Sequence, residues 1–342
     1  MPTFRIVWLE ERPPGDLELA RSLLPDGFTI EMASASKSGA ASAEAGALLS
    51  QANALLVQHS AVSEQVLAQA PQVRLVQLYG VRDEAIDRAA AQRREITVAV
   101  MPLRGCIAVA ELGMTFVLAL SKQLLKAQQV TATGAYRTLG LTPMSTNQSR
   151  HAFQWMKLDG LFEVNGRTLG IIGLGEIGTE VAKRATAFGM EVLYNKRTRL
   201  PERAERGLSV EWAELGRLLA VSDFVMLALP YSDAVHHLIG ERELSLMRAT
   251  AFLVNIARGP LVDEAALAWA LANGQIAGAG LDVFTEEPLP FDSDLVKSPR
   301  VILTPHIGGG TGGAREKQLS DVLRNIVEFA GTGEARYSSS SP

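Results

Sequence analysis

Short apolar runs alternate with stretches of helical periodicity along almost the whole chain. The first series of runs predicts five strands, at Arg5–Leu9, Phe28–Met32, Ala54–Gln58, Leu75–Tyr79 and Ile96–Val100. Helical patterns such as Ser63–Gln69 and Ile86–Arg94 lie between them, and residues Ala33–Gly46 predict a loop that leads into a helix. Strands that alternate with helices are typical of a parallel sheet, so the pattern predicts an α/β fold.

A second series of strands follows a long predicted helix, Ile107–Val130, and a less regular segment. Its six strands are expected at Thr168–Ile172, Glu191–Tyr194, Phe224–Leu229, Phe252–Asn255, Ala279–Val283 and Val301–Leu303. Helices are expected between them at Ile177–Phe188, Trp212–Ala220, Leu238–Met247 and Glu264–Ala272. This series has the size and order of a Rossmann dinucleotide-binding unit. The last helix, Ala314–Phe329, could return to the first sheet, which would make the first domain discontinuous.

Composition narrows the class of protein. The 342 residues carry a net charge of −4, and 47% of them are hydrophobic. That is enough chain for two domains, and the charge balance does not favour binding to nucleic acid. The single cysteine, Cys106, cannot form an intramolecular disulfide. The short N-terminal apolar run and the interrupted helix at Val109–Leu125 argue against a signal peptide and a membrane span. We therefore expect a cytoplasmic enzyme, with no metal site.

A glycine-rich turn follows the first strand of the second series. Its glycines are Gly173, Gly175 and Gly178, and a helix is expected to begin at Glu176 and Ile177. The first glycine allows a tight turn, the second lets a pyrophosphate approach the backbone, and the third lets the helix pack closely on the strand. Alone, this spacing is a weak signal, but between a strand and a helix it predicts dinucleotide binding.

The end of the next strand distinguishes between cofactors. An acidic residue there would bind the ribose 2′-hydroxyl of NAD, but the chain reads Asn195, Lys196, Arg197, Thr198 and Arg199. Cations after a neutral residue would accept a 2′-phosphate. The turn therefore favours NADP, although NAD stays possible and a merely solvated basic turn would look the same.

Three further motifs follow later strands of the second series. They are Asn255-Ile256-Ala257-Arg258-Gly259, then Gly280-Leu281-Asp282 with Glu287-Pro288, then Thr304-Pro305-His306-Ile307-Gly308. With these motifs behind the glycine loop, the chain resembles the D-isomer-specific 2-hydroxyacid dehydrogenase family, from about Ala54 to Phe329.

The resemblance implies a fold, an assembly and a reaction. It implies two Rossmann-like or flavodoxin-like parallel-sheet domains, with the cofactor domain inserted within the substrate domain. The substrate domain would comprise residues 1–106 and 307–342, and the dinucleotide domain 107–306. It also implies a homodimer, and an NAD(P)-dependent oxidoreductase that interconverts a small 2-oxo acid and a D-2-hydroxy acid.

Within that family, Arg258, Glu287 and His306 match the three catalytic positions. An imidazole titrates near neutrality, so His306 suits a general acid, and Glu287 would orient it. Arg258 would bind the substrate carboxylate and polarise its carbonyl. By family analogy, Asp282 would contact the nicotinamide end of the cofactor. The same analogy places Leu229, Pro230, Ile256, Ala257, His306 and Gly308 beside the cofactor. Alone, each triad member would be better explained as a structural ion pair, a loop cap or a satisfied histidine, but the three in this order behind the glycine loop favour the catalytic interpretation.

One departure from the family concerns the substrate loop. The family carries Gly-x-Gly here, whereas this chain reads Gly80-Val81-Arg82. A side chain at the second glycine restricts the backbone, which puts the usual amide cradle in doubt. Arg82 either supplies a cation to a larger or more acidic substrate or points to solvent, and we expect its replacement by alanine to raise KM only in the first case.

A second departure is the long segment Ala135–Asn165. Its apolar residues Phe153, Trp155 and Met156 suit burial against another surface. The segment either packs on a partner subunit or forms a long surface loop with one apolar anchor.

The sequence leaves several functions open. The favoured one is NADP-preferring reduction of a small 2-oxo acid such as glyoxylate or hydroxypyruvate. On the same fold, the substrate could instead be 3-phosphoglycerate, a bulkier 2-oxo acid or an anion such as phosphite. A dehydrogenase-like sensor would bind the dinucleotide with little turnover.

Overall fold

The computed structural model describes residues 3–33, 43–80, 83, 85–101, 103–310 and 313–336, and it divides the chain into two compact units. The first unit runs from the N-terminus to Arg104 and includes the C-terminal residues from Gly312. The second unit is Gly105–Thr311. Both ends of the chain build one unit and its middle builds the other, which is the arrangement of one domain inserted within another.

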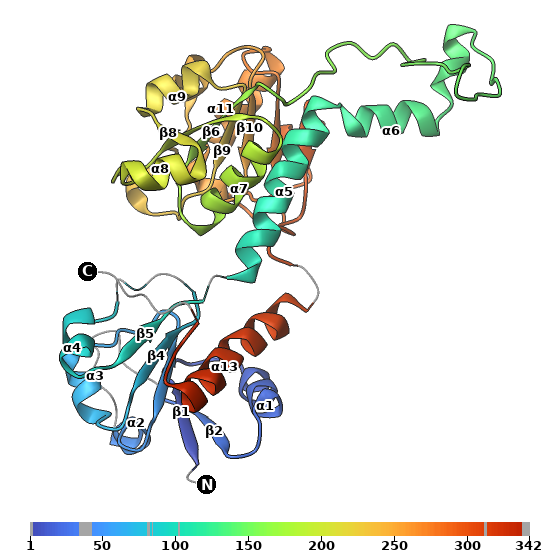
Figure 1. The fold of residues 1–342 in the computed structure, drawn as a ribbon. Coiled ribbons are helices and arrows are strands. Elements are labelled where there is room, and N and C mark those ends of the chain that lie inside the picture. Colours follow the sequence, from blue (N-terminus) through green and yellow to red (C-terminus); the bar gives the residue numbers. More distant parts are fainter. Residues whose placement is uncertain are drawn as a thin grey trace. The chain divides into compact units, whose positions relative to one another are not determined.

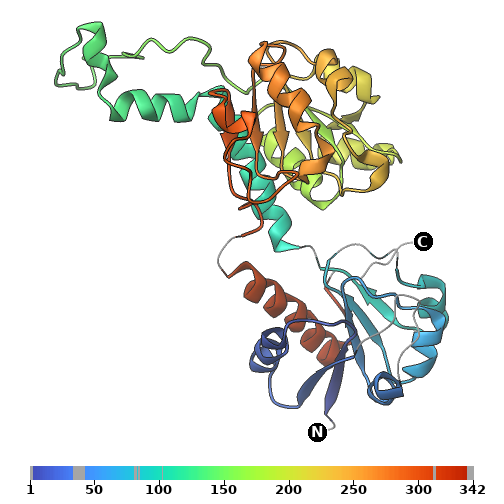
Figure 2. The same cartoon turned by 180° about the vertical axis from the view of Figure 1, so that it is seen from behind.

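The first unit is a five-stranded parallel sheet in the order β2-β1-β3-β4-β5 (Figure 1). Its strands are β1 (Phe4–Trp8), β2 (Phe28–Met32), β3 (Ala54–Val57), β4 (Leu75–Leu78) and β5 (Thr97–Ala99). Its helices are α1 (Pro14–Leu23), α2 (Ala43–Leu49), α3 (Glu64–Gln69), α4 (Arg88–Arg93) and α13 (Ala314–Thr332). Helices α1 and α13 lie side by side on one face, and α2 to α4 cover the other (Figure 2).

The second unit is a seven-stranded parallel sheet in the order β12-β11-β10-β9-β6-β7-β8. Its strands are β6 (Thr168–Ile172), β7 (Glu191–Asn195), β8 (Val210–Trp212), β9 (Phe224–Leu227), β10 (Phe252–Asn255), β11 (Gly278–Leu281) and β12 (Val301–Leu303). One face packs on α5 (Arg104–Ser121) and α7 (Glu176–Ala187), with α8 (Glu202–Leu208) at its edge. The other face packs on α9 (Leu215–Val221), α10 (Glu241–Leu246), α11 (Glu264–Ala272) and α12 (Asp294–Lys297). These two units confirm the predicted α/β fold.

The order of the second sheet fixes where a ligand can bind. From β6 the chain proceeds outward through β7 and β8, then crosses to β9 and proceeds the other way. The strand order therefore reverses between β6 and β9. In open parallel sheets, ligands bind at the carboxyl ends of the strands at such a switch point.

Two local predictions were wrong. The expected helix Ile107–Val130 is two helices, α5 and α6 (Leu124–Ala132), because Gln123 adopts a left-handed backbone with φ 47°. The Gln123 side chain donates to Asp159 O and the Lys122 side chain donates to Phe162 O, so tertiary contacts hold this break. The second error was to miss β8 and α8, whose residues have mixed polarity, and the helix expected from Trp212 begins at Leu215.

Helix α5 is long and apolar enough to cross a membrane, by its length and its mean hydropathy of 1.5 alone. Half of this stretch is buried inside the structure. Gly113 makes that packing close, since a Cβ at this position would lie 2.9 Å from the Ile256 side chain. Helix α5 therefore packs as a core helix of the second unit.

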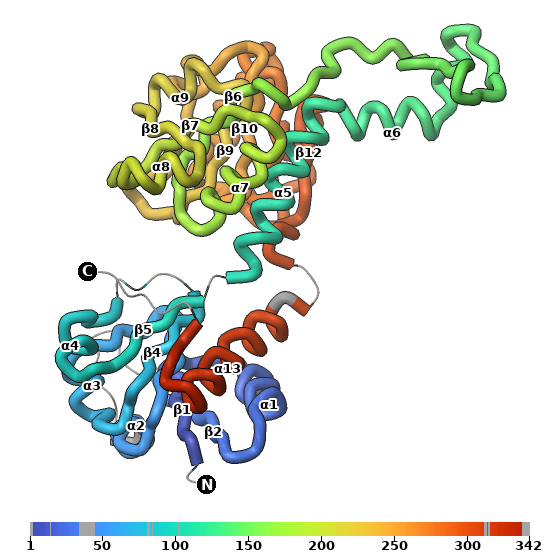
Figure 3. Tube along the Cα trace, in the orientation of Figure 1, coloured from blue at the N-terminus to red at the C-terminus, as the bar shows by residue number. Residues whose placement is uncertain are grey.

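Residues 122–161 form an arm within the second unit, between α5 and the segment that leads to β6 (Figures 1 and 3). The Phe162 amide donates to the Ser121 carbonyl at 3.2 Å and closes the base of the arm. None of the residues 122–161 is buried. Phe153 is 84% exposed, and Leu124 and Leu125 are more than half exposed. So much exposed apolar surface in one segment is typical of an interaction site.

Candidate active site and cofactor site

Three polar loops meet at one edge of the second sheet. Arg258 follows β10, Asp282 and Glu287 follow β11, and His306 follows β12. These strands are parallel neighbours, with Asn255 beside Leu281 and Leu281 beside Leu303. Their carboxyl ends therefore lie together, and residues far apart in the sequence share one edge.

His306 and Glu287 form a pair at this edge. The imidazole Nδ1 lies 2.7 Å from Glu287 Oε2. The Phe284 amide donates to Glu287 Oε1 at 3.0 Å, so both carboxylate oxygens are engaged. Because the acceptor fixes Nδ1 as the protonated nitrogen, Nε2 is the nitrogen left for other partners. The side chains are 46% and 37% exposed, which keeps the pair accessible to a reactant.

The pKa of Glu287 is lowered by its surroundings. Partial burial acts to raise it, but the hydrogen bonds from His306 and the Phe284 amide act in the opposite direction. The positive charges of His306 and Arg258 lower the pKa further, and the net effect is a decrease. Glu287 is therefore a carboxylate throughout the neutral range.

Asp282 holds the loop that carries His306. Its Oδ1 accepts from the Thr304 hydroxyl at 2.6 Å and from the Ile307 amide at 2.8 Å, and its Oδ2 accepts from the Gly308 amide at 2.9 Å. His306 has φ 54°, a backbone conformation that is costly for a non-glycine residue. The bonds to the buried Asp282 on both sides of His306 compensate for that cost and fix where the imidazole lies.

Arg258 is exposed at the same edge. The next residue, Gly259, packs directly on the loop after β11, since a Cβ there would lie 1.8 Å from the carbonyl carbon of Phe284. The Asn255 side chain donates to the Arg258 carbonyl at 2.9 Å and accepts from the Ala257 amide at 3.0 Å. The backbone that presents the guanidinium is therefore fixed, and its charge is one of those that lower the pKa of Glu287.

The glycine loop after β6 fits a dinucleotide. Gly173 has φ 97°, and a Cβ there would lie 2.6 Å from the Ala228 carbonyl oxygen and from Leu229. A Cβ on Gly178 would lie 2.3 Å from the Gly173 carbonyl oxygen, so α7 and β6 pack too closely for any side chain. A Cβ on Gly175 would meet only open space, and no side chain caps α7. The loop thus leaves room for a phosphate beside the first amides of the helix.

The remaining predicted cofactor residues lie around this loop or on its sheet edge. Leu229 and Pro230 follow β9, the strand beside β6, and Leu229 touches Gly173. Ile256 and Ala257 follow β10 and are buried. Glu176 and Ile177 begin α7, and the Cys106 thiol donates to the Glu176 carboxylate at 3.3 Å. Burial, with the nearby negative charges of Glu176 and Glu180, raises the pKa of Cys106 to about 12, so this thiol is not a nucleophile near neutral pH.

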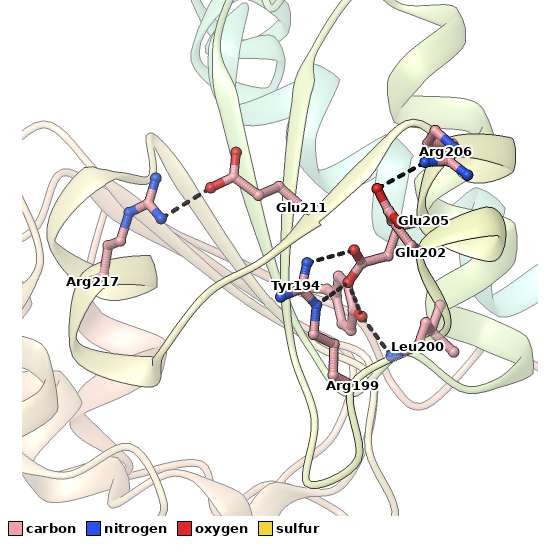
Figure 4. Close-up of polar contacts among 8 residues, drawn as sticks. All are labelled: Tyr194, Arg199, Leu200, Glu202, Glu205, Arg206, Glu211 and Arg217. Carbon is pink, nitrogen blue, oxygen red and sulfur yellow. Dashed lines mark hydrogen bonds and ion pairs between the residues drawn. The ribbon is translucent and has the colours of Figure 1, made fainter.

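The basic turn after β7 separates its cations into two groups, of which Figure 4 shows the Arg199 contact with Glu205. Arg199 is bound to Glu205 of α8 through two hydrogen bonds of 2.8 Å. Among the residues that the structure describes, the side chains of Lys196 and Arg197 have no hydrogen bond or ion pair. This division could not be predicted from the sequence, because an acid six residues beyond Arg199 has no local signature.

The substrate loop is described only in part. Gly80 has φ 140°, in the region that favours glycine, and Asp83 pairs with Arg88. Val81 and Arg82 lie outside the described residues, so their predicted contact with a substrate stays a prediction.

Several known proteins are similar to this chain. The model of the family described as "D-isomer specific 2-hydroxyacid dehydrogenase, NAD binding domain" matches residues 114–308. A glyoxylate reductase of Thermococcus gammatolerans is 44% identical over 265 residues, which cover 78% of this chain and 75% of that protein. A glyoxylate reductase of Pyrococcus horikoshii is 38% identical over 312 residues, 91% of this chain and 90% of that protein. Among solved structures, a glyoxylate reductase from Paecilomyes thermophila is 27% identical with a TM-score of 0.59, and 99% of each chain is covered. The resemblance seen in the motifs is confirmed, and the chain belongs to the D-isomer-specific 2-hydroxyacid dehydrogenase family.

Proposed function

We propose that this protein is an NADP-preferring reductase that converts a small 2-oxo acid, such as glyoxylate or hydroxypyruvate, to its 2-hydroxy acid, with the D configuration where the product is chiral. The observation that carries the proposal is the His306–Glu287 pair beside Arg258, at the sheet edge that also holds the glycine loop. The relatives named as glyoxylate reductases support the choice of substrate class.

The three side chains divide the work on the substrate. A bound nicotinamide dinucleotide supplies the hydride that the carbonyl carbon requires. His306 gives the carbonyl oxygen a proton from Nε2, because Nδ1 is engaged by Glu287. Glu287 keeps the ring in this orientation and stabilises its protonated form. Arg258 binds the substrate carboxylate and polarises the carbonyl, since a guanidinium matches a planar anion and is always charged.

Several described groups would hold the cofactor. The loop at Gly173–Gly178 would receive the pyrophosphate, and Lys196, Arg197 and Thr198 would receive a 2′-phosphate. Leu229, Pro230, Ile256 and Ala257 would line the dinucleotide along the carboxyl edge of the sheet. Asp282 would offer one remaining acceptor position on Oδ2 to the nicotinamide end, because among the described residues its side chain otherwise accepts only from Thr304, Ile307 and Gly308 in the loop after β12.

The first experiment measures oxidation of NADPH and NADH against a panel of 2-oxo acids, with His306→Gln as the control. We expect turnover that depends on the substrate, a higher kcat/KM with NADPH, and loss of turnover in the variant. Tight binding of the dinucleotide with no turnover on any acid of the panel would contradict the proposal and favour a sensor. Turnover only with 3-phosphoglycerate or phosphite would contradict the proposed class of substrate. It would leave the catalytic roles of Arg258, Glu287 and His306 unchanged.

The arm supports a homodimer. Its large apolar side chains stay exposed, and burying them against a second copy would offset the entropy cost of ordering the segment. We expect Phe153→Asp to shift the protein from dimer to monomer in light scattering. Phe291→Asp is the matched control, because Phe291 is 93% exposed but lies outside the arm. A Phe153→Asp protein that stays dimeric at the same concentrations would refute this role for the arm.

A further inference from the structure

The turn after β7 is fixed by a group of three side chains, Tyr194, Arg199 and Glu205, which we call the clamp (Figure 4). Glu205 is a buried acid with 7% of its side chain exposed. Arg199 donates to both of its oxygens, and the fully buried Tyr194 donates its hydroxyl to Oε1 at 2.7 Å. Such a two-pronged guanidinium–carboxylate contact fixes direction as well as distance.

The clamp joins both ends of the turn. The Tyr194 hydroxyl, at the end of β7, also accepts from the Leu200 amide at 2.8 Å. A single phenol therefore ties the start of the turn to its end. Two further contacts hold the start of the turn: the Asn195 side chain donates to the Ala213 carbonyl at 2.8 Å, and the Trp212 indole donates to the Lys196 carbonyl at 3.4 Å.

None of these contacts involves the side chains of Lys196, Arg197 or Thr198. The backbone of the turn is held at its start and at its end. Arg197 and Thr198 are exposed, and Lys196 is half-buried. The Arg199 guanidinium, by contrast, is paired with Glu205. The hydrogen bonds from Arg199 and from the Tyr194 hydroxyl lower the pKa of Glu205 to about 2. The turn is thus a rigid frame that presents two cations and a hydroxyl.

We propose that the clamp sets the preference for NADP by positioning the turn, and that Arg199 acts as a positioning residue without touching the cofactor. The inference rests on the proposed function, because it assumes that the turn receives a 2′-phosphate. A rigid frame avoids the ordering cost that a flexible basic loop would incur on binding, so disrupting the clamp weakens recognition even though no contact to the phosphate is removed.

Simple electrostatics makes the opposite prediction for one variant. Glu205→Gln removes a negative charge from the neighbourhood and frees Arg199. If only charge mattered, a 2′-phosphate would bind more tightly to this variant. If the clamp matters, the phosphate binds more weakly, because the frame is lost.

The test uses two fragments of the cofactor, 2′,5′-ADP and 5′-AMP, with affinities measured by isothermal titration calorimetry on the full chain. We expect Glu205→Gln, Tyr194→Phe and Arg199→Lys each to weaken 2′,5′-ADP by about tenfold and to leave 5′-AMP within about twofold. Arg199→Lys keeps the charge but cannot reproduce the two-pronged contact. Glu202→Gln is the matched control, because the same substitution is made on α8 in an exposed pair with Arg206.

Thermal stability is measured on the same samples. Variants that lose stability but keep the wild-type ratio of the two affinities overturn the inference, and so does tighter binding of 2′,5′-ADP to Glu205→Gln. If Glu205→Gln does not fold, Tyr194→Phe and Arg199→Lys decide the question by the ratio of their affinities for 2′,5′-ADP and 5′-AMP. Arg197→Ala distinguishes a failure of the clamp inference from a failure of the proposed NADP preference. If only this variant loses the preference for 2′,5′-ADP, the turn still binds the 2′-phosphate but the clamp does not control it. A wild-type protein that binds both fragments equally rejects both.

Discussion

Two glutamates of the second unit accept similar hydrogen bonds but work under different conditions. Glu205 accepts from Arg199 and Tyr194 at 2.7 to 2.8 Å, and 7% of its side chain is exposed. Glu287 lies 2.7 Å from the His306 ring, and 37% of its side chain is exposed. The pKa of each glutamate is lowered. For Glu205 the largest cause is the hydrogen bond from Arg199, and for Glu287 hydrogen bonds and nearby positive charges outweigh the effect of burial.

The partner decides what each carboxylate can do. A guanidinium stays charged at any working pH, so the Arg199–Glu205 pair is a permanent contact that shapes a turn. An imidazole gains and loses a proton near neutrality, so the His306–Glu287 pair can pass a proton to a reactant. Exposure differs in the same sense, because a structural pair needs no access from solvent, whereas a proton donor must be reached by its substrate.

The largest expected effect comes from removing the proton donor. His306→Gln keeps a side chain of polar character and similar reach but cannot act as an acid. We expect kcat for reduction to fall by about 10²- to 10⁴-fold, the usual contribution of general acid catalysis. The dissociation constant for NADPH, followed by fluorescence titration, should change little. A variant with near wild-type kcat would remove His306 from the mechanism.

A smaller loss is expected at its partner. Glu287→Gln keeps the shape of the acceptor but removes the charge that favours the protonated ring. We expect kcat to fall by about tenfold to a hundredfold, less than for loss of the imidazole itself. The comparison between the two glutamates breaks if Glu205→Gln lowers kcat at saturating NADPH as much as Glu287→Gln does.

The pH dependence of stability should depend on Glu205. Its pKa in the folded state is about 2, below the ordinary value of 4.5, so the ionised carboxylate adds stability above pH 4.5 and loses it as the pH falls toward 2. The Tm difference between the wild type and Glu205→Gln should therefore be largest near neutral pH and shrink as the buffer becomes acidic. A difference that is constant over this range would show that the charge of Glu205 does not matter to stability.

The smallest effect is expected at Cys106, another ionisable residue of the second unit. Its pKa of about 12 means that almost no thiolate exists near neutral pH. Cys106→Ala should leave kcat within about twofold of the wild type. Labelling of the native protein by iodoacetamide should be much slower than labelling of the unfolded chain. Rapid labelling of the native thiol would contradict its raised pKa.

Much of the site could be predicted from local pattern. The glycine spacing lies between a strand and a helix, and each of Arg258, Glu287 and His306 follows the end of a strand, so the order of elements brought them to one edge. The break at Gln123 could not be predicted, because it depends on contacts with Asp159 and Phe162 across the base of the arm. The role of Asp282 in shaping the His306 loop was also missed, since its donors lie more than twenty residues away along the chain.

The sequence alone determined the class of fold and the place of the glycine loop, because periodicity and strand–loop order are local properties of the chain. The catalytic roles of Arg258, Glu287 and His306 were assigned by resemblance to the family and stay a prediction. Only the tertiary structure decided which of the charged side chains form ion pairs. It bound Arg199 to Glu205, left Lys196 and Arg197 without such a partner among the described residues, and turned Nδ1 of His306 toward Glu287. The physical reason is that the partner, burial and pKa of a charged group depend on neighbours brought together by the sheet, whose places in the sequence carry no local sign.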